Sequence, residues 1–272
     1  KYIATVTQEI IRDCAVYTVK AVTVVEIMGR DAGWLTASAE LGRLLGLPSP
    51  DLVYLPERAF DIFKLFLTDF TDEEIRHCVN SAYSSNFETE NVAELSHLLT
   101  GTYILELWHG PTCAFKDMAL QMLPQLLSAS LKKTGEDKTV CILVATSGDT
   151  GKAALEGFCN VENTEIMVFY PSDGVSPMQK LQMDSQKGEN VHVCAIKGNF
   201  DDAQTGVKKI FTNNLVKEKL ADNNMQFSSA NSINWGRLAP QIVYYISAYC
   251  DMLNRGEDYL NDGFNVVVPT GN

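Results

Sequence analysis

The sequence predicts an α/β fold built on a doubly wound parallel sheet. From residue 138 onward, short apolar runs rich in Val, Ile and aromatic residues alternate with longer segments of helical periodicity. Apolar strands that alternate with helices are typical of a parallel sheet with both faces covered by helices. The chain of 272 residues is 46% hydrophobic and 21% charged, an ordinary globular composition that is enough to bury a substantial core. In such a sheet, ligands are expected at the carboxyl ends of the strands.

The expected elements follow one another without an internal repeat or a low-complexity segment. In the second half of the chain we expect strands at 138–146, 165–171, 190–198 and 264–271, and helices at 151–158, 176–186, 200–220 and 233–253. We expect the first sixty residues to form a βαβ-like piece of their own, with strands at 21–30 and 50–57 and a helix at 32–46; an amphipathic segment at 63–70 follows it. No Gly/Ser-rich linker marks a boundary between the two parts.

The net charge of −12 argues against nucleic acid and against an anionic membrane as partners. It leaves a small anionic substrate open, because a site can be locally positive on an acidic protein. No apolar run reaches membrane-spanning length, and the seven cysteines form no pair with the spacing of a metal site. We therefore expect a cytoplasmic protein without a metal, whose cysteines are reduced and lie mostly in the core. The chain starts on Lys1 and stops just after a strand-like run, so both ends look cut.

One lysine stands between a glycine-proline turn and an apolar helical run, in the stretch HGPTCAFKDMAL. Lys116 has Ala114, Phe115 and Leu120 as close neighbours in the sequence. Apolar neighbours desolvate an amine and lower its pKa, which makes the amine available as an imine-forming nucleophile near neutral pH. The same stretch also fits a surface lysine at the start of a helix, and most lysines in proteins are exposed.

The segment ATSGDTG, residues 145–151, joins an expected strand to an expected helix. Its two glycines allow a tight turn, and the free N–H groups at the start of the helix form an anion site. Thr146, Ser147 and Thr150 add hydroxyl groups that suit a carboxylate or a phosphate. A plain strand-to-helix turn with polar capping residues explains the segment equally well.

A further polar cluster, SSANSINWGR, lies at the start of the last expected helix. Arg237 can bind phosphate oxygens through its guanidinium group, and Asn231 and Ser232 can complete the shell. An N-cap cluster with Arg237 on the surface is the alternative. A glycine turn with Gly271 and Asn272 lies at the end of the last expected strand, and by itself it is weak evidence for a binding site.

The four motifs ELWHGPTCAFKD, ATSGDTG, NSINWGR and VVVPTGN occur in the order found in threonine synthase, which the chain resembles from about residue 63 to residue 272. The resemblance implies a pyridoxal-phosphate enzyme of the tryptophan-synthase β-like fold (fold type II). The implied reaction converts O-phosphohomoserine and water to threonine and phosphate. A phospholyase acting on a related phosphorylated amino acid would share these motifs.

The same resemblance implies a role for each polar cluster. Lys116 matches the lysine that holds the cofactor and then acts as the base, and Asp149 lies in the segment that faces the cofactor ring. The residues matched to the substrate carboxylate are Thr146, Ser147 and Thr150, those matched to the substrate phosphate are Asn231, Ser232 and Arg237, and those matched to the cofactor phosphate are Gly271 and Asn272.

Residues 1–62 resemble a different family. VVEIMGRDAGWLTASAEL and PDLVYLPE are similar to phosphofructokinases, most of all to the pyrophosphate-dependent ones. In that family, the residues matched by Met28, Gly29, Arg30 and Glu57 help to bind the sugar phosphate. The phosphate-donor loop and the catalytic aspartates of the family have no counterpart here. We therefore expect a chimera of two incomplete α/β pieces, 1–62 and 63–272, with the second piece truncated at its carboxyl end. Sugar-phosphate binding by the first piece and a chain without catalytic activity are the alternatives.

Overall fold

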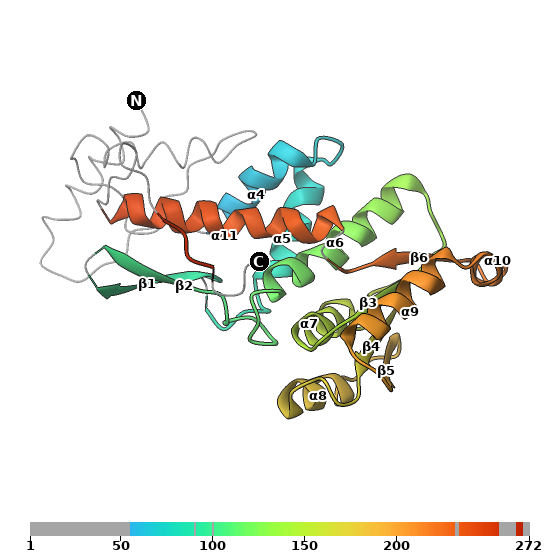
Figure 1. Cartoon of the computed structure of the whole chain (residues 1–272). Helices are drawn as coiled ribbons and strands as arrows, with labels where there is room; N and C mark the ends of the chain where they lie inside the picture. The colour runs from blue at the N-terminus through green and yellow to red at the C-terminus, as the bar shows by residue number, and fades with distance from the viewer. Residues whose placement is uncertain (1–54, 90, 100, 232–233, 256–264, 269–272) are drawn as a thin grey trace, which may run out of the picture.

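The computed structural model describes residues 55–89, 91–99, 101–231, 234–255 and 265–268. They form a parallel sheet with helices on both faces, a second group of helices beside it, and a separate two-stranded hairpin (Figure 1). The helices are α4 (Leu55–Phe66), α5 (Asp72–Tyr83), α6 (Asp117–Thr134), α7 (Asp149–Phe158), α8 (Pro177–Asp184), α9 (Phe200–Thr212), α10 (Asn214–Asp222) and α11 (Trp235–Asn254). The strands are β1 (Glu94–Leu99), β2 (Thr102–Glu106), β3 (Thr139–Ala145), β4 (Thr164–Pro171), β5 (Val191–Ile196) and β6 (Met225–Ser229).

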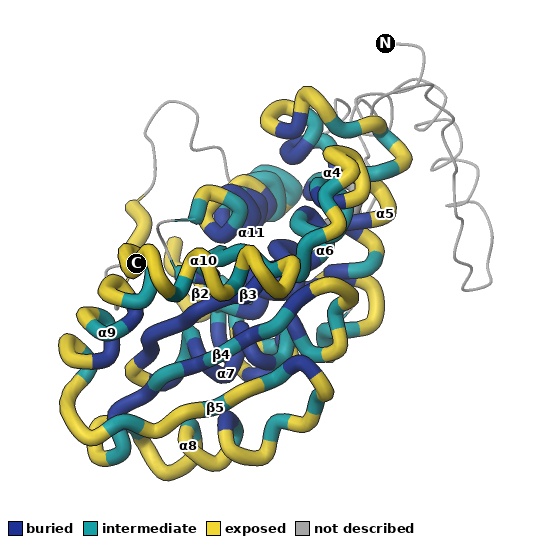
Figure 2. The backbone as a smooth tube through the Cα atoms, turned by 90° about the vertical axis from the view of Figure 1, so that its right-hand side faces the viewer, coloured by how far each residue is buried: buried dark blue, intermediate teal, exposed yellow. Residues whose placement is uncertain are grey.

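The four-stranded sheet has the order β5-β4-β3-β6, and each neighbouring pair is parallel. Alternate residues of β3 enter two different cores. Val140, Ile142 and Val144 pack with α7 on one face, whereas Cys141 and Leu143 pack with α9 on the other. The central strands are accordingly buried along most of their length (Figure 2). This confirms the predicted α/β class with a parallel sheet covered on both faces.

The strand order reverses beside β3. The chain runs outward from β3 through β4 to β5, and then returns to the other side of β3 to form β6. The carboxyl ends of β3 and β6 therefore lie next to each other, and the ligand crevice of an open α/β sheet is expected at such a reversal.

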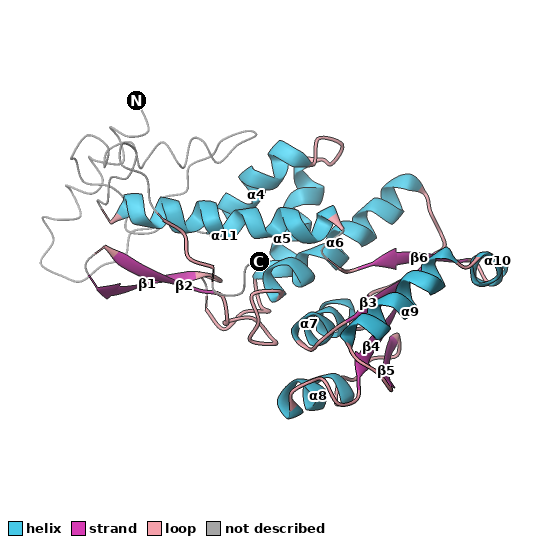
Figure 3. Cartoon of the chain, viewed as in Figure 1, coloured by secondary structure: helices cyan, strands magenta, loops and turns pink. Residues whose placement is uncertain are grey.

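Helix α6 lies between the sheet and the second group of helices, which consists of α4, α5 and α11 (Figure 3). Its residues Met118 and Met122 pack into the helical core, while Leu120 and Leu123 pack toward α7 and the sheet. A helix that is apolar on two faces is expected where both faces are buried. The first turn of α6 thus contributes to both cores, through Met118 and Leu120.

Four elements were not predicted from the sequence: α5, the two hairpin strands β1 and β2, and β6. The start of α5 has a capping box, in which Thr71 accepts from the N–H of Glu74 and the Glu74 side chain accepts from the N–H of Thr71. A Thr three residues before a Glu is a recognisable start signal for a helix. The hairpin is antiparallel and turns at Gly101, where φ is +69°.

Three predicted elements were wrong in part. Residues 55–57, expected to end a strand, form the first turn of α4, where Pro56 costs no helical hydrogen bond. The single helix expected at 200–220 is broken at Asn213, whose extended backbone ends α9 and whose side chain caps α10 through the N–H of Val216. Residues 265–268 are not in a strand, and Val267 is 85% exposed.

The cysteines also differ from the prediction. Of those described, Cys78 and Cys141 are buried, but Cys113 and Cys194 are exposed. None of the helices in the described ranges combines the length and the apolar character that crossing a bilayer requires. The elements expected at 21–30 and 32–46, and the residues Met28, Gly29 and Arg30 within or beside them, lie outside the described residues.

The expected boundary near residue 62 falls inside α4, which runs without a break from residue 55 to residue 66. Ala59 and Phe60, before the boundary, and Phe63, after it, all belong to the same helical core. Arg58 reaches α11, where its Nη1 lies 2.6 Å from Asp251 Oδ1 and 2.8 Å from Ser247 Oγ. The end of the first piece is therefore packed into the second, and the division of the chain at residue 62 stays a prediction.

Replacing Arg58 by methionine should lower the free energy of unfolding by about 1–2 kcal/mol, because it removes a half-buried ion pair and its hydrogen bonds. The pair is well shielded, since the Arg58 side chain is only 12% exposed. Chemical denaturation measures the change, with Lys217→Met on the exposed helix α10 as the control. An unchanged midpoint for Arg58→Met would show that this contact does not hold the amino-terminal piece to the rest.

Candidate functional site

Lys116 lies directly before α6 and is partly desolvated. Its side chain is 17% exposed, and its Nζ lies 4.0 Å from the centre of the Phe115 ring. Burial lowers the pKa of this amine; the Asp149 carboxylate opposes the shift, and the nearby Arg237 and Lys152 add to it. The lysine is thus not an ordinary solvated surface residue, and its surroundings are those expected for an amine that has to lose its proton.

The loop ahead of Lys116 is fixed by the next residue, Asp117, which is fully buried. Its carboxylate accepts from the N–H of Thr112 at 2.9 Å, from the Thr112 hydroxyl at 2.6 Å and from the N–H of Ala114 at 3.4 Å. Burial raises the pKa of Asp117, although these hydrogen bonds oppose the shift. A Cβ on Gly110 would lie 2.6 Å from the Asp117 side chain, so this position requires glycine. The backbone of Lys116 is therefore held by a closed polar loop.

The ATSGDTG segment forms the turn from β3 into α7, as predicted. The Thr146 hydroxyl oxygen accepts from the N–H groups of Gly148 and Gly151, each at 2.9 Å, so this side chain shapes the loop. Gly148 has φ +143°, and a Cβ there would lie 2.3 Å from the Gln179 side chain. Across the described residues, the N–H groups of Asp149 and Thr150 find no hydrogen-bond partner. The start of α7 is consequently available to an anion, and Ser147 is exposed beside it.

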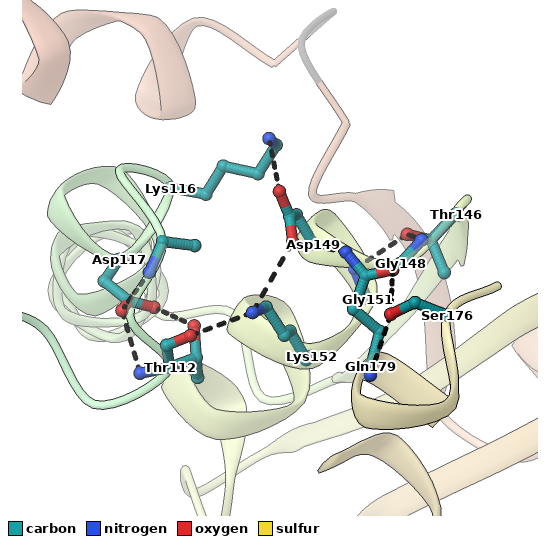
Figure 4. A network of polar contacts seen from close by, with 11 residues as sticks. Thr112, Lys116, Asp117, Thr146, Gly148, Asp149, Gly151, Lys152, Ser176 and Gln179 are labelled. Atoms are coloured by element: carbon teal, nitrogen blue, oxygen red, sulfur yellow. Dashed lines mark hydrogen bonds and ion pairs between the residues drawn. The ribbon is translucent and has the colours of Figure 1, made fainter. Parts of the chain in front are cut away.

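Asp149 joins the two segments (Figure 4). Its Oδ2 lies 3.8 Å from Lys116 Nζ, and its Oδ1 lies 3.5 Å from Lys152 Nζ. Gln179 of α8 donates to the same Oδ1 at 2.7 Å. Partial burial raises the pKa of Asp149, but the Gln179 hydrogen bond and the two ammonium groups outweigh it and leave the pKa below its usual value. Asp149 is therefore an ionised carboxylate between two cations.

Arg237 supplies a third cation, from the first turn of α11. It is 5% exposed, and its Nη1 donates to the Ala230 carbonyl at 3.1 Å. Its Nε is buried and has no hydrogen-bond partner, and no carboxylate of the described chain forms an ion pair with it. A buried guanidinium without a counter-ion is a candidate binding site for an anion, because an unpaired buried charge is unfavourable. Asn231 donates to the Ala145 carbonyl at 3.5 Å, which ties the end of β6 to the end of β3.

The structure thus brings the described candidate residues of the three motifs together at the carboxyl ends of β3 and β6, where the strand order reverses. Ser232, Gly271 and Asn272 lie outside the described residues, as do the side chain of Glu57 and all of residues 28–30. Their roles stay predictions.

Sequence reasoning missed Lys152, Gln179 and Thr112, which complete the network around Asp149 and Asp117. Lys152 follows Asp149 by three residues, a spacing that places the two side chains on the same face of a helix, so the sequence held a signal for it. Gln179 comes from another helix, and no local pattern announces that contact.

A separate group of possible metal ligands lies between the hairpin and the loop before Lys116. Glu94, Glu106 and His109 offer ligand atoms within 4.8 Å of one another. His109 Nε2 and Glu106 Oε2 lie 2.7 Å apart and are hydrogen-bonded to each other. The described surroundings give no second sign of an ion, and the expectation of a protein without a metal stays a prediction.

The chain is similar in sequence to threonine synthases. Threonine synthase-like 1 of Homo sapiens is 38% identical over 210 residues, which are 75% of this chain and 28% of that protein. Threonine synthase of Pseudomonas aeruginosa is 39% identical over 234 residues, which are 86% of this chain and 46% of that protein. No family model matches the sequence.

Solved structures of threonine synthases are also similar to this chain. A pyridoxal-phosphate-bound threonine synthase from Brucella melitensis superposes with a TM-score of 0.66 at 38% identity, over 73% of this chain and 41% of that one. The yeast threonine synthase superposes with a TM-score of 0.67 at 34% identity, over 76% of this chain and 42% of that one. This chain is homologous to part of a threonine synthase.

The threonine synthase resemblance and the α/β fold expected from it are therefore confirmed. The chain spans less than half the length of these threonine synthases. The resemblance of residues 1–62 to phosphofructokinases is not tested by these matches and stays a prediction.

Proposed function

We propose that this chain carries the lysine-bearing part of a pyridoxal-phosphate-dependent threonine synthase, a lyase that acts on a phosphorylated amino acid. The observation that carries the proposal is the position of Lys116: a partly desolvated amine, 3.8 Å from Asp149, at the place where the strand order reverses. The homology to threonine synthases supports the same assignment.

The residues present fit the cofactor. Lys116 would hold it through its amine, which makes no hydrogen bond to Asp149 at their separation of 3.8 Å. Asp149 and the open first turn of α7 would lie beside the cofactor ring, and Gly271 and Asn272 would bind the cofactor phosphate. Pyridoxal phosphate, when bound, supplies an electron sink for the carbanions of the reaction.

The proposed substrate is O-phosphohomoserine, and the site offers candidate partners for its two anionic groups, the carboxylate and the phosphate. Its carboxylate would bind at the ATSGDTG turn, through Ser147, Thr150 and the free N–H groups of α7. Thr146 would act by holding this turn in shape. The substrate phosphate would bind to Arg237, whose Nε has no hydrogen-bond partner, together with Asn231 and Ser232.

Lys116 would also be the base. An amine whose pKa is lowered by burial carries less of its charged form near neutral pH, so it can take a proton from the α or the β carbon of the substrate and return it. Asp149 would keep the amine oriented without binding it tightly. Loss of phosphate from the γ carbon and addition of water at the β carbon then give threonine and inorganic phosphate.

The experiment that tests this function measures phosphate release and threonine formation from O-phosphohomoserine, with and without added pyridoxal phosphate. The proposal expects both products, in equal amounts, only when the cofactor is present. Phosphate release without threonine would favour a phospholyase on a related phosphorylated amino acid. Saturable binding of fructose 6-phosphate without cofactor uptake would favour the phosphofructokinase-like interpretation of residues 1–62 instead.

Replacing Arg237 by methionine should weaken binding of the phosphorylated substrate about tenfold or more, because a desolvated charged hydrogen bond is lost. Cofactor attachment at Lys116 should be retained. Equilibrium binding of O-phosphohomoserine to the cofactor-loaded protein measures the effect, with Arg76→Met on the exposed face of α5 as the control. Equal affinities for Arg237→Met and the wild type would remove Arg237 from the substrate site.

The chimeric origin of the chain and its cytoplasmic location stay predictions.

A further inference from the structure

Lys152 is a buried cation to which neither the motifs nor the proposed reaction gives a role. It lies in the second turn of α7, and its side chain is only 10% exposed. A buried ammonium group is unfavourable unless it is paired and hydrogen-bonded. Here the Nζ donates to the Thr112 carbonyl at 2.9 Å and lies 3.5 Å from Asp149 Oδ1.

These two contacts connect Lys152 to both sides of the site. Thr112 belongs to the loop that Asp117 holds in front of Lys116, and Asp149 is the carboxylate that faces Lys116. Lys152 therefore fixes the loop of the lysine against the helix that carries the carboxylate (Figure 4).

The distances show how the Asp149 carboxylate is shared. Oδ1 accepts from Gln179 at 2.7 Å and has the Lys152 ammonium 3.5 Å away, whereas Oδ2 remains 3.8 Å from Lys116 Nζ. A close ammonium–carboxylate pair would have a separation near 2.8 Å. Asp149 is thus held on the side of Lys152 and Gln179, and it does not close on Lys116.

We propose that Lys152 is a positioning residue, which holds the Asp149 carboxylate away from a close ion pair with Lys116 and so keeps the Lys116 amine available. Without Lys152, the carboxylate would lose a competing cation and would move toward Lys116. This inference rests on the proposed function, because an available amine has a use only if Lys116 reacts.

The other charges around Lys116 agree with this assignment. The groups that face it are Asp149 and Lys152 from α7 and Arg237 from α11, and Asp117 lies beside it at the start of α6. The positive charges of Arg237 and Lys152 both lower the pKa of Lys116, and only Asp149 raises it. Removing the Lys152 charge takes away one of the two cations and at the same time frees Asp149.

The test is a pH titration of the Lys116 amine in the protein without cofactor. Trace labelling with acetic anhydride, followed by mass spectrometry of the peptide that contains Lys116, gives the pH at which half of the amine is unprotonated. In Lys152→Met, this midpoint should rise by about half a pH unit, so labelling below the midpoint should fall about threefold. Lys152→Arg keeps the charge and should restore the wild-type midpoint.

A double-mutant cycle tests whether the effect passes through Asp149. In an Asp149→Asn background, the shift caused by Lys152→Met should be clearly smaller, because the residue that would close on Lys116 is neutral. A shift of the same size in both backgrounds would overturn the proposal. An unchanged midpoint in folded Lys152→Met would overturn it as well.

Two controls separate this result from other failures. Lys152→Gln is a second neutral variant, whose amide can still donate to Thr112, and it should reproduce the shift if Lys152→Met does not fold. Lys132→Met, on the exposed end of α6, should leave the midpoint unchanged. Because labelling needs no cofactor, its outcome is independent of cofactor uptake: a wild type that binds no pyridoxal phosphate would refute the proposed function alone.

Discussion

Replacing Lys116 by alanine is expected to abolish covalent attachment of pyridoxal phosphate. The wild type should develop the absorbance band of a protein-bound cofactor with a stoichiometry of about one per chain, and the variant should leave the cofactor free. The neighbouring Lys152 should not substitute for it, because its Nζ donates to the Thr112 carbonyl. Product formation from O-phosphohomoserine should fall by about 10⁴-fold or more, as expected when both the covalent anchor and the base are lost.

The matched control is Lys132→Met, which removes an exposed lysine from the other end of the same helix. It should bind the cofactor as the wild type does. Circular dichroism should show that Lys116→Ala is folded, since the side chain is not part of a hydrophobic core. An undiminished absorbance band in folded Lys116→Ala would place the cofactor elsewhere.

Replacing Gly157 by alanine is expected to destabilise the protein and to disturb the site from a distance. A Cβ at this position of α7 would lie 2.0 Å from the carbonyl oxygen of Leu120 in α6. This carbonyl is four residues before Pro124, which has no N–H to bond to it, so α7 can pack closely against the exposed oxygen. The clash is with backbone, and it can be relieved only by separating the two helices.

We expect the free energy of unfolding to fall by about 2 kcal/mol, within the usual range for an overpacked helix contact. Because Lys116 precedes α6 and Asp149 begins α7, separating these helices also changes the Lys116–Asp149 distance. Cofactor affinity should therefore fall together with stability. Chemical denaturation and cofactor titration measure the two effects.

The control for this prediction is the same substitution in another helix. Gly206 lies inside α9, and a Cβ there would meet no atom within 4 Å. Gly206→Ala should raise the free energy of unfolding by about 0.5–1 kcal/mol, because alanine loses less backbone entropy in a helix. If Gly157→Ala stabilised the protein as Gly206→Ala does, close packing of α6 on α7 would not be a determinant of the fold.

The parts of the fold that the sequence predicted correctly are those with an unbroken physical signal. β3 and β4 are buried by helices on both faces, so they read as apolar runs, and the segments between them have helical periodicity. Lys116 was singled out because its neighbours in the sequence are apolar, and in the structure its side chain is only 17% exposed and lies against the Phe115 ring.

The parts that the sequence missed depend on contacts between distant segments. The hairpin strands β1 and β2 are mostly half-buried or exposed and carry a weak apolar pattern. The valines at 266–268 read as a strand, but a strand requires a partner, and these residues are exposed. At Asn213 a side-chain cap competes with a helical pattern that continues on both sides.

The candidate site also depends on contacts between segments that are distant in the sequence. Gln179 reaches Asp149 only because α8 packs on α7, and Arg237 at the start of α11 is buried only because α11 packs on α6. Because both residue types also occur on protein surfaces, the sequence left the position of Arg237 open and gave no sign of the Gln179 contact.

The most direct test of Lys116 as the cofactor-binding residue is to identify the lysine to which the cofactor becomes covalently attached. The protein is loaded with pyridoxal phosphate, reduced with borohydride, digested and sequenced by mass spectrometry. We expect a single phosphopyridoxyl group, on Lys116 of the HGPTCAFK stretch. A phosphopyridoxyl group on any other lysine, with Lys116 unmodified, would contradict the assignment of Lys116 as the cofactor-binding residue.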